Sequence, residues 1–282
     1  MNTTTTTTAE RLGPLAATAL IPLVARASDA RQRYPILSDR TSAAVANRLD
    51  LGRAVAAVDD STRVGCCLRG LVIDTWLAQL AESAGGQLAA VVDLGVGLNT
   101  RSHRLAGIAE RYVEVDSGEV IALRDQLLPV TSSTRLATDA MHVLGWASHV
   151  APTCGPVAVV CEALLAYQTP ERVQSFLDDL SCLLPQAHVL FDSMSPAAAW
   201  LANRPAVRAG GRPRYTWATR STGRLRSAGR PLRIVAETTL LRQPRQWTSL
   251  FPAKERLLFA LPGLRGAFRI THAQLQNPGA AK

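Results

Sequence analysis

Lysine is nearly absent from this chain of 282 residues, which has only Lys254 and Lys282 among its 31 basic residues. Aromatic residues make up 5% and charged residues 19%, whereas hydrophobic residues make up 47%. This balance is typical of a globular protein with a sizeable core, and it excludes a disordered, collagen-like or disulfide-scaffold class for the bulk of the chain. The length suits one large α/β domain or two small ones.

Paired cysteines and long apolar runs are missing as well. The five cysteines form no Cys-x-x-Cys pair and have no histidine at ligand spacing, so we expect reduced thiols and no metal site. No apolar run of about 18 residues lacks a charge or a proline, which argues against a membrane span. Residues 12–25 resemble a secretory segment, but Pro14 and Pro22 interrupt it. We therefore expect a cytoplasmic protein whose residues 1–17 form a disordered tail.

The positive charge is concentrated in one stretch. Eleven arginines and a single acid, Glu237, lie between Arg204 and Arg245. This stretch carries +10 and the rest of the chain −1, for a total of +9. Its arginines could attract an acidic substrate through bidentate hydrogen bonds, or they could be solvated with no special partner.

The remaining sequence alternates between helical and strand patterns. Apolar residues at a spacing of three and four predict helices at 43–58 and 64–83, within a helical N-terminal cap of residues 18–86. Short apolar runs predict strands at 88–94, 111–116, 157–161 and 188–192, with helices at 100–110, 117–128 and 170–184. Residues 232–241 and 267–275 would add an antiparallel pair. Residues 87–282 are therefore predicted to form a doubly wound α/β domain.

A glycine-containing turn follows the first predicted strand. In Val91-Val-Asp-Leu-Gly-Val-Gly97, Gly95 and Gly97 allow the backbone to turn sharply and to approach a ligand closely. Asp116 ends the next strand about 20 residues later, where a carboxylate can accept hydrogen bonds from both ribose hydroxyls. The pattern predicts a nucleoside-containing cofactor at the carboxyl ends of the strands.

Two residues favour S-adenosylmethionine over NAD as that cofactor. A dinucleotide fingerprint requires a third glycine, and this chain has Thr100 at that position. Asp93 lies two residues before the first glycine, and its carboxylate suits a cationic amino-acid tail better than a pyrophosphate.

These motifs resemble the leucine carboxyl methyltransferase family, in particular its bacterial branch of polyketide-tailoring O-methyltransferases. The resemblance covers roughly residues 18–195, with a weaker similarity at 261–265. Five stretches carry it: Thr18-Ala-Leu20 with Arg26-Ala27 and Ser38-Asp39; Cys67-Leu-Arg-Gly-Leu-Val-Ile-Asp74; Leu94-Gly-Val-Gly-Leu-Asn-Thr-Arg101 with Arg104-Leu105; Tyr112-Val-Glu-Val-Asp116 through Leu123-Arg-Asp-Gln-Leu-Leu-Pro129; and Cys161-Glu-Ala-Leu-Leu-Ala-Tyr167 with Phe191-Asp192-Ser193. The resemblance implies a class I methyltransferase fold, which is a Rossmann-like doubly wound sheet, with an N-terminal helical extension and an acceptor-side insertion.

The resemblance also implies roles for the matched residues. Arg69 would pair with the methionine carboxylate, and Glu162 would complete the pocket near the methionyl end. Asp116 would hold the ribose and Asp139 would lie by the adenine amino group, while the two glycines would line the cofactor. Each residue also has a structural interpretation, as a solvated helix residue, a helix cap, a loop acid or an acid stabilised by a helix dipole.

Two residues depart from the family pattern. Asn99 stands where the family usually has Asp, which is a mild change because it keeps a polar helix start. Ala163 stands where the family usually has Gly, and it adds a methyl group where the backbone approaches the ligand. A homologue that binds the cofactor without turning it over is therefore an alternative.

We predict an S-adenosylmethionine-dependent O-methyltransferase that converts a carboxylate of a small, polyketide-like natural product to a methyl ester. A carboxylate is ionised at pH 7 and needs no general base. A phenol would need one, for which His103 and His142 are weak candidates. One alternative is a phenol or hydroxyl methyltransferase of similar metabolites. The other is an RNA-binding protein that uses the arginine-rich stretch, with Tyr215, Trp217 and Trp247 as stacking residues.

Overall fold

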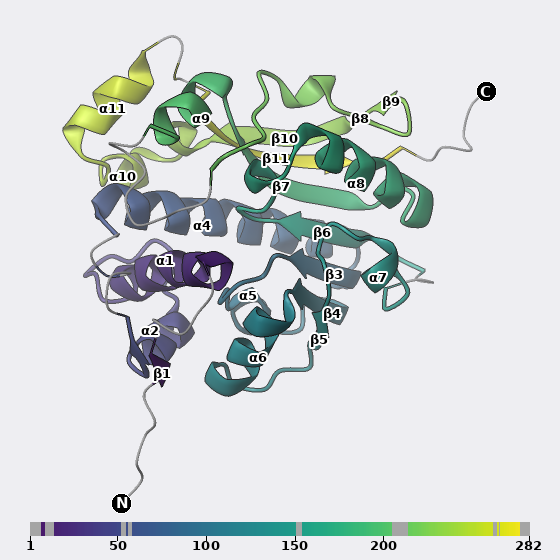
Figure 1. Ribbon diagram of the computed structural model, residues 1–282, viewed down its shortest axis with the longest axis horizontal. Coiled ribbons are helices and arrows are strands. Elements are labelled where there is room, and N and C mark those ends of the chain that lie inside the picture. Colours follow the sequence, from purple (N-terminus) through teal and green to yellow (C-terminus); the bar gives the residue numbers. More distant parts are fainter. Residues whose placement is uncertain are drawn as a thin grey trace, which may run out of the picture.

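A seven-stranded sheet forms the centre of the protein (Figure 1). Its parallel strands are β3 (Leu88–Leu94), β4 (Ala109–Asp116), β5 (Thr134–Ala137), β6 (Val157–Cys161) and β7 (His188–Met194). At one edge, β11 (Phe268–Gln274) pairs antiparallel with both β7 and β10 (Arg233–Thr239), so the strand order is β10-β11-β7-β6-β3-β4-β5. The computed structural model describes residues 7–8, 14–51, 55, 58–150, 154–204, 214–261, 264 and 266–276.

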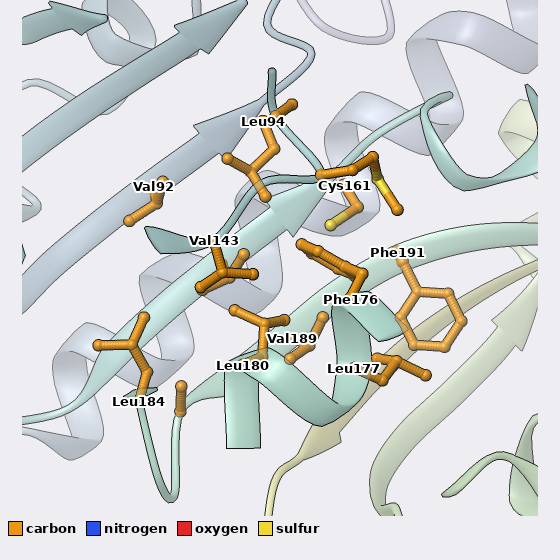
Figure 2. Close-up of a cluster of buried hydrophobic side chains, with 14 of the residues drawn as sticks. Val92, Leu94, Val143, Cys161, Phe176, Leu177, Leu180, Leu184, Val189 and Phe191 are labelled. Atoms are coloured by element: carbon orange, nitrogen blue, oxygen red, sulfur yellow. The ribbon is translucent and has the colours of Figure 1, made fainter. Parts of the chain in front are cut away.

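Helices cover both faces of the sheet, because successive strand residues point to opposite sides. On one face, α4 (Asp60–Ser83) packs on residues that include Val91 and Val160. On the other face, α7 (Leu144–Ala147) and α8 (Pro170–Leu183) pack on residues that include Val92 and Val159. Figure 2 shows this second cluster, where Phe176, Leu177 and Leu180 of α8 point toward the strands. Burial on both faces accounts for the continuous apolar runs of these strands.

After β5 the chain changes the direction in which it adds strands to the sheet, so the switch point lies between the parallel neighbours β3 and β6. From β3 the chain proceeds outward through β4 and β5, whereas β6 and β7 lie on the other side of β3. Ligands of open α/β sheets bind outside the carboxyl ends of the strands at such a switch point. Helices α5 (Arg101–Arg104) and α6 (Gly118–Leu127) start at this end, after β3 and β4.

The N-terminal helices lie beside this end of the sheet. Helix α1 (Pro14–Asp29) contacts α4 and α2 (Arg40–Ala46), and a short parallel pair joins β1 (Thr7–Thr8) to β2 (Leu49–Asp50). The chain after β7 forms α9 (Pro196–Ala202), the hairpin β8 (Arg226–Ser227) and β9 (Arg230–Pro231), α10 (Arg245–Thr248) and α11 (Ala253–Ala260). The 3-10 turns of the described residues are η2 (Leu165–Tyr167), η4 (Thr222–Arg224) and η5 (Leu240–Arg242).

The predicted fold class is confirmed, and the ranges predicted for two strands coincide with β3 and β6. The predicted antiparallel pair is also confirmed as β10 and β11. Because β10 belongs to the main sheet, part of the arginine-rich stretch is integral to the fold and is not an insertion.

Several predicted elements have to be corrected. The helix predicted at 43–58 ends at Ala46, because the chain extends at β2 to pair with β1, and most of 52–57 lies outside the described residues. The helix predicted at 100–110 ends at Arg104, because Gly107 has φ +82° and β4 begins at Ala109. Strand β5 was not predicted, since it has four residues and none is fully buried.

The prediction that residues 1–17 form a disordered tail is wrong in part, because α1 begins at Pro14 and β1 lies at residues 7–8. The other residues of that range lie outside the described part of the chain. Helix α4 is the one helix among the described residues whose length and hydropathy would allow it to span a membrane, and half of that stretch is buried. Its apolar residues pack on the sheet, which accounts for its hydropathy.

Candidate active site

A cavity of about 570 Å³ lies at the carboxyl ends of β3, β4 and β6. All seven residues predicted to bind the cofactor line it: Arg69, Asp93, Gly95, Gly97, Asp116, Asp139 and Glu162. They come from α4, three strand ends and the chain that follows β5. Their gathering in one cavity supports the predicted site, while their contact with a cofactor stays a prediction.

The glycine loop forms one wall of this cavity with backbone atoms. Gly95 has φ +60° and Gly97 has φ +51°, a region that disfavours other residues. A Cβ atom on Gly95 would lie 3.0 Å from Cδ1 of Leu164, and one on Gly97 would lie 3.2 Å from Cβ of Ala19. The loop therefore fits between α1 and the chain after β6 only without side chains at these two positions.

Asp116 is half-buried at the end of β4. Its Oδ2 accepts a hydrogen bond of 2.8 Å from the backbone N–H of Gly97, and its Oδ1 accepts one of 2.7 Å from that of Ser117. Burial raises the pKa of this carboxyl, although the two backbone donors oppose the rise. The backbone bonds fix the carboxylate at the cavity, and the remaining lone pairs of its oxygens can accept from ribose hydroxyls.

Asp139 lies at the exposed rim of the cavity. Its Oδ2 pairs with Nη2 of Arg172 at 2.5 Å, and its Oδ1 accepts from the backbone N–H of Met141 at 3.0 Å. Arg172 and Met141 also line the cavity. Both side chains of the ion pair are about half exposed, at 51% for Arg172 and 55% for Asp139, so solvent weakens this pair.

Glu162 is the most heavily paired carboxylate of the cavity. Its Oε1 accepts from Nε of Arg69 at 3.0 Å, and its Oε2 accepts from Arg101 and from Nδ2 of Asn99. Burial alone would raise the pKa of Glu162, but the two guanidinium groups hold this pKa well below its usual range. Glu162 is therefore a fixed anion and not a proton carrier at neutral pH.

Asp93 already has partners within the protein. It is buried, and its Oδ2 accepts from Nη1 of Arg101 at 2.7 Å and from the Tyr112 hydroxyl at 3.3 Å. Arg101 therefore offsets the charge of Asp93, and the contact of Asp93 with a cationic tail stays a prediction. Burial raises the pKa of Asp93 and Arg101 opposes this rise.

Arg69 also has carboxylate partners within the protein. Besides Glu162, it lies 3.5 Å from Asp192, measured from Nη1 to Oδ2. A guanidinium has five N–H donors, so a ligand carboxylate can still bind the donors that these contacts leave. Arg26 of α1 is a second buried cation on the cavity wall, and its Nη2 donates to the backbone oxygen of Leu98 at 3.0 Å.

Sequence reasoning assigned no role to several residues of the cavity. Ala19, Pro22 and Arg26 of α1 form part of the wall, as do Tyr167 and Arg172. The resemblance covered the stretches that contain Ala19, Arg26 and Tyr167 without giving these residues a role, and the family motif was the one signal that could have found them. The fold alone explains Pro22 and Arg172, because α1 and the start of α8 reach this wall only after folding.

Neither predicted histidine lines the cavity. His103 has its Nε2 3.3 Å from the backbone oxygen of Pro129, and burial lowers its pKa. His142 is exposed. None of the five histidines of the chain is among the described residues that line the cavity.

The arginine-rich stretch contributes no cavity-lining arginine in the part of it that the structure describes. Residues 205–213, with two of its arginines, lie outside the described residues. The stretch instead packs beside the cavity: Tyr215 stacks on Tyr167 with ring centroids 5.0 Å apart. The backbone N–H groups of Thr216 and Trp217 both donate to the carbonyl of Ala166. The described arginines of this stretch are therefore not part of the cavity wall, and their binding of a substrate stays a prediction.

Comparison with known proteins gives the same class. No family profile matches the chain. It is 27% identical over 249 residues to the tetracenomycin polyketide synthesis O-methyltransferase TcmP of Streptomyces glaucescens, covering 85% of each chain. It is 32% identical over 174 residues to the S-adenosyl-L-methionine-dependent methyltransferase dpfgK of Gibberella zeae, covering 57% of this chain and 58% of that protein. The crystal structure of a DUF574 family protein from Streptomyces avermitilis matches the fold with a TM-score of 0.55 and 17% identity, over 92% of this chain and 97% of that one.

The fold, the cavity and these relatives define the class: the chain is an S-adenosylmethionine-dependent methyltransferase with a class I, Rossmann-like sheet. Its cofactor is S-adenosylmethionine, and the cavity suits this molecule. The glycine loop leaves room for close approach of the ligand, and Asp116 offers a fixed carboxylate where a ribose would lie. Within the class, the chain is related to a methyltransferase of polyketide synthesis.

Proposed function

We propose that this enzyme methylates a carboxylate oxygen of a small, polyketide-like natural product and releases a methyl ester. The relative in tetracenomycin synthesis supports an oxygen acceptor and this class of metabolite, since the two chains align over most of their length. The resemblance of the glycine loop and the β4 region to the leucine carboxyl methyltransferase family supports the carboxylate. Within this proposal the chain is a bacterial-type member of that family.

The observation that carries the proposal is the lack of a suitable general base on the described cavity wall. No histidine lies there, and the three aspartates of the wall already accept hydrogen bonds from Arg101, from Arg172 or from backbone N–H groups. Glu162 is held ionised by its arginines, so it binds protons only in strong acid. Tyr167 is the one tyrosine on the wall, and burial together with Tyr215 raises its pKa, which makes it a poor base at pH 7. An acceptor that is already ionised requires none of these groups.

Cations on the wall suit an anionic acceptor. Arg26 and Arg69 are both largely buried and Arg172 lies at the rim. Guanidinium groups bind carboxylates with two parallel hydrogen bonds, which gives direction as well as charge attraction. Each of the three also pairs with an acid of the protein, so an acidic acceptor would bind the N–H donors that these ion pairs leave.

The mechanism of the protein is positioning. When bound, the cofactor supplies a methyl group activated by its sulfonium. The protein has to hold the acceptor oxygen in line with that group and keep water out, which can contribute up to about 7–11 kcal/mol. The glycine loop and Asp116 would fix the nucleoside, and α1 would cover the methionyl side through Pro22 and Arg26.

The nucleic-acid alternative needs exposed aromatic side chains on which bases could stack. Trp217 is buried in the main core with 5% of its surface exposed, and Trp247 packs against a cluster around Phe251. Tyr215 lies on Tyr167. Bases stack on exposed aromatic faces, so these three residues do not form a platform for RNA. A phenol or hydroxyl acceptor gives a methyl ether where a carboxylate gives a methyl ester, and the test below separates the two.

The test is the chemical lability of the transferred label. The enzyme would be incubated with S-adenosylmethionine carrying a radiolabelled methyl group and with an aromatic polyketide acid that has both phenol and carboxyl groups. A methyl ester releases labelled methanol in mild alkali, whereas a methyl ether keeps its label. We expect alkali-labile label from the acid and none from the decarboxylated analogue. Alkali-stable label would instead establish the phenol methyltransferase.

A further inference from the structure

Arg101 lies directly behind the cavity wall without lining it. It begins helix α5 immediately after the glycine loop, and its side chain is 0% exposed. Nε lies 2.6 Å from Oδ1 of Asp74 and Nη1 lies 2.7 Å from Oδ2 of Asp93, while Nη2 donates to Oε2 of Glu162. One guanidinium therefore joins carboxylates from α4, from the end of β3 and from the residue after β6.

Two of these carboxylates, Asp93 and Glu162, line the cavity. Like charges this close together in a buried place repel each other, and burial disfavours their charged forms. Among the described residues, Arg101 is the one side chain that contacts both of them. Arg69 reaches Glu162 and Asp192 instead, and the Tyr112 hydroxyl contacts Asp93 as a neutral group.

We propose that Arg101 is a positioning residue of the cofactor site, which holds Asp93 and Glu162 charged and fixed in direction while touching no ligand itself. The proposal rests on the cavity being the cofactor site. The planar guanidinium, with donors on three nitrogens, can meet three carboxylates at once, which a lysine ammonium on a flexible stem does less well. The role passes through the two acids, because Arg101 itself is screened from the cavity.

Other charged or titratable groups also face these two acids and have to be held constant in a test. They are Arg69 of α4, Arg26 of α1, Glu114 and Tyr112 of β4, Cys161 of β6 and Asp192 of β7. None is altered by a substitution at Arg101. Loss of Arg101 therefore leaves Asp93 and Glu162 with the same neighbours but without the cation between them. At least one of the two is then expected to take up a proton near neutral pH.

The experiment is calorimetric titration of Arg101→Gln with S-adenosylhomocysteine at several pH values between 6.5 and 8.5. We expect the dissociation constant at pH 7 to rise about tenfold or more and to recover in part at pH 8.5, where the acids lose their added proton. The wild type should vary by less than about twofold over this range. Arg101→Lys should show a smaller rise with the same pH trend, and it carries the test if the glutamine variant does not fold.

Arg63→Gln is the matched control. Arg63 is also buried, with 10% of its side chain exposed, and pairs with Asp29 and Asp60, neither of which lines the cavity. This variant should have a lower melting temperature but bind S-adenosylhomocysteine within about twofold of the wild type at each pH. Equal losses of affinity in both variants would assign Arg101 a merely structural role and overturn the proposal.

Wild-type affinity with a flat pH profile in a folded Arg101 variant, whether Gln or Lys, would overturn the proposal as well. Failure of the wild type itself to bind S-adenosylhomocysteine is a different result. It would reject the cavity as the cofactor site, and with it the premise of the role assigned to Arg101. The two failures are therefore distinguished by the wild-type titration alone.

Discussion

Ala163 carries backbone strain at the cavity wall. Its φ of +56° lies in the left-handed region, where a Cβ costs about 1–2 kcal/mol. The conformation aims its N–H at Oδ1 of Asp192, 2.5 Å away. The family pattern has glycine at this position, and the geometry shows why glycine suits it.

Ala163→Gly is therefore expected to raise the free energy of unfolding by about 0.5–1 kcal/mol. Glycine relieves the backbone strain of the folded state. Its greater entropy in the unfolded chain offsets part of this gain, but not all of it. Urea denaturation measures the change. Ala199→Gly, inside helix α9, is the control and should lower stability by about 1 kcal/mol. A lower free energy of unfolding for Ala163→Gly would show that the left-handed conformation does not strain Ala163.

Asp116 provides the sharpest test of ligand contact at the residue scale. Asp116→Ala removes the carboxylate expected to bind both ribose hydroxyls, so S-adenosylhomocysteine should bind about 2 kcal/mol more weakly in calorimetry. Asp125→Ala is the control, because Asp125 pairs with Arg135 away from the cavity. Equal affinity of the Asp116 variant and the wild type would remove the ribose assignment.

At the scale of elements, the pairing of β7 with β11 places the buried His272 beside the partly buried His188. His188 Nδ1 lies 2.8 Å from His272 Nε2. Burial, the neighbouring His188 and Arg233 lower the pKa of His272 to about 4. In the unfolded chain this group titrates near pH 6.5, so the unfolded state binds more protons between pH 6.5 and 4.

The stability contributed by neutral His272 is therefore complete above about pH 6.5 and is lost as the pH falls toward 4. For one histidine this amounts to about 2 kcal/mol between pH 6.5 and 5. Urea denaturation at pH 5, 6, 7 and 8 should show this slope in the wild type and a shallower one in His272→Gln. The exposed His142, changed to Gln, should leave the slope as in the wild type. An unchanged slope in His272→Gln would place the acid sensitivity elsewhere.

Uniform burial made the bounds of two strands predictable from the sequence. Strands β3 and β6 are buried along their whole length, so their apolar runs mark their ends. The pair β10 and β11 was predicted with less exact bounds, because β10 is only partly buried. Strand β5 has no apolar run, and α5 is cut short by Gly107, whose effect depends on the conformation that it adopts. Local pattern thus predicts the central strands closely and misses the short edge strand β5.

The cavity was predicted to the extent that its residues fall in local motifs. Gly95, Gly97 and Asp116 follow strands at a recognisable spacing. The role of Arg101 could not be predicted, because its partners Asp74 and Glu162 are 27 and 61 residues away in the chain. Contacts at such separation arise from the topology of the sheet and leave no periodic signal.

For the whole molecule, the charge of the arginine-rich stretch is dispersed. Its described arginines are spread over η4, the β8–β9 hairpin, β10, η5, α10 and the loops around them, and most are exposed. The arginines of the cavity wall come from α1, α4 and α8 instead. Arg26 and Arg69 are largely buried, whereas Arg172 is half exposed. Salt screens exposed charges far more than buried pairs.

The affinity for S-adenosylhomocysteine should accordingly change by less than about twofold between 0.05 and 0.2 M salt in calorimetry. An RNA-binding surface would lose affinity about tenfold or more over the same range. Fluorescence anisotropy with a labelled single-stranded RNA is the companion measurement. Tight binding of the RNA at low salt with a steep salt dependence would revive the nucleic-acid alternative.

The order of strands has a consequence for how the chain is made. β11 lies between β7 and β10, although it follows both of them in the chain. On the ribosome, β10 therefore emerges before the strand that is its sole partner in the sheet, and β7 keeps an open edge until residues 268–274 arrive. Unpaired edges attract other chains. Synthesis that stops after residue 260 would leave two such edges, and that product should aggregate while the complete chain remains dispersed.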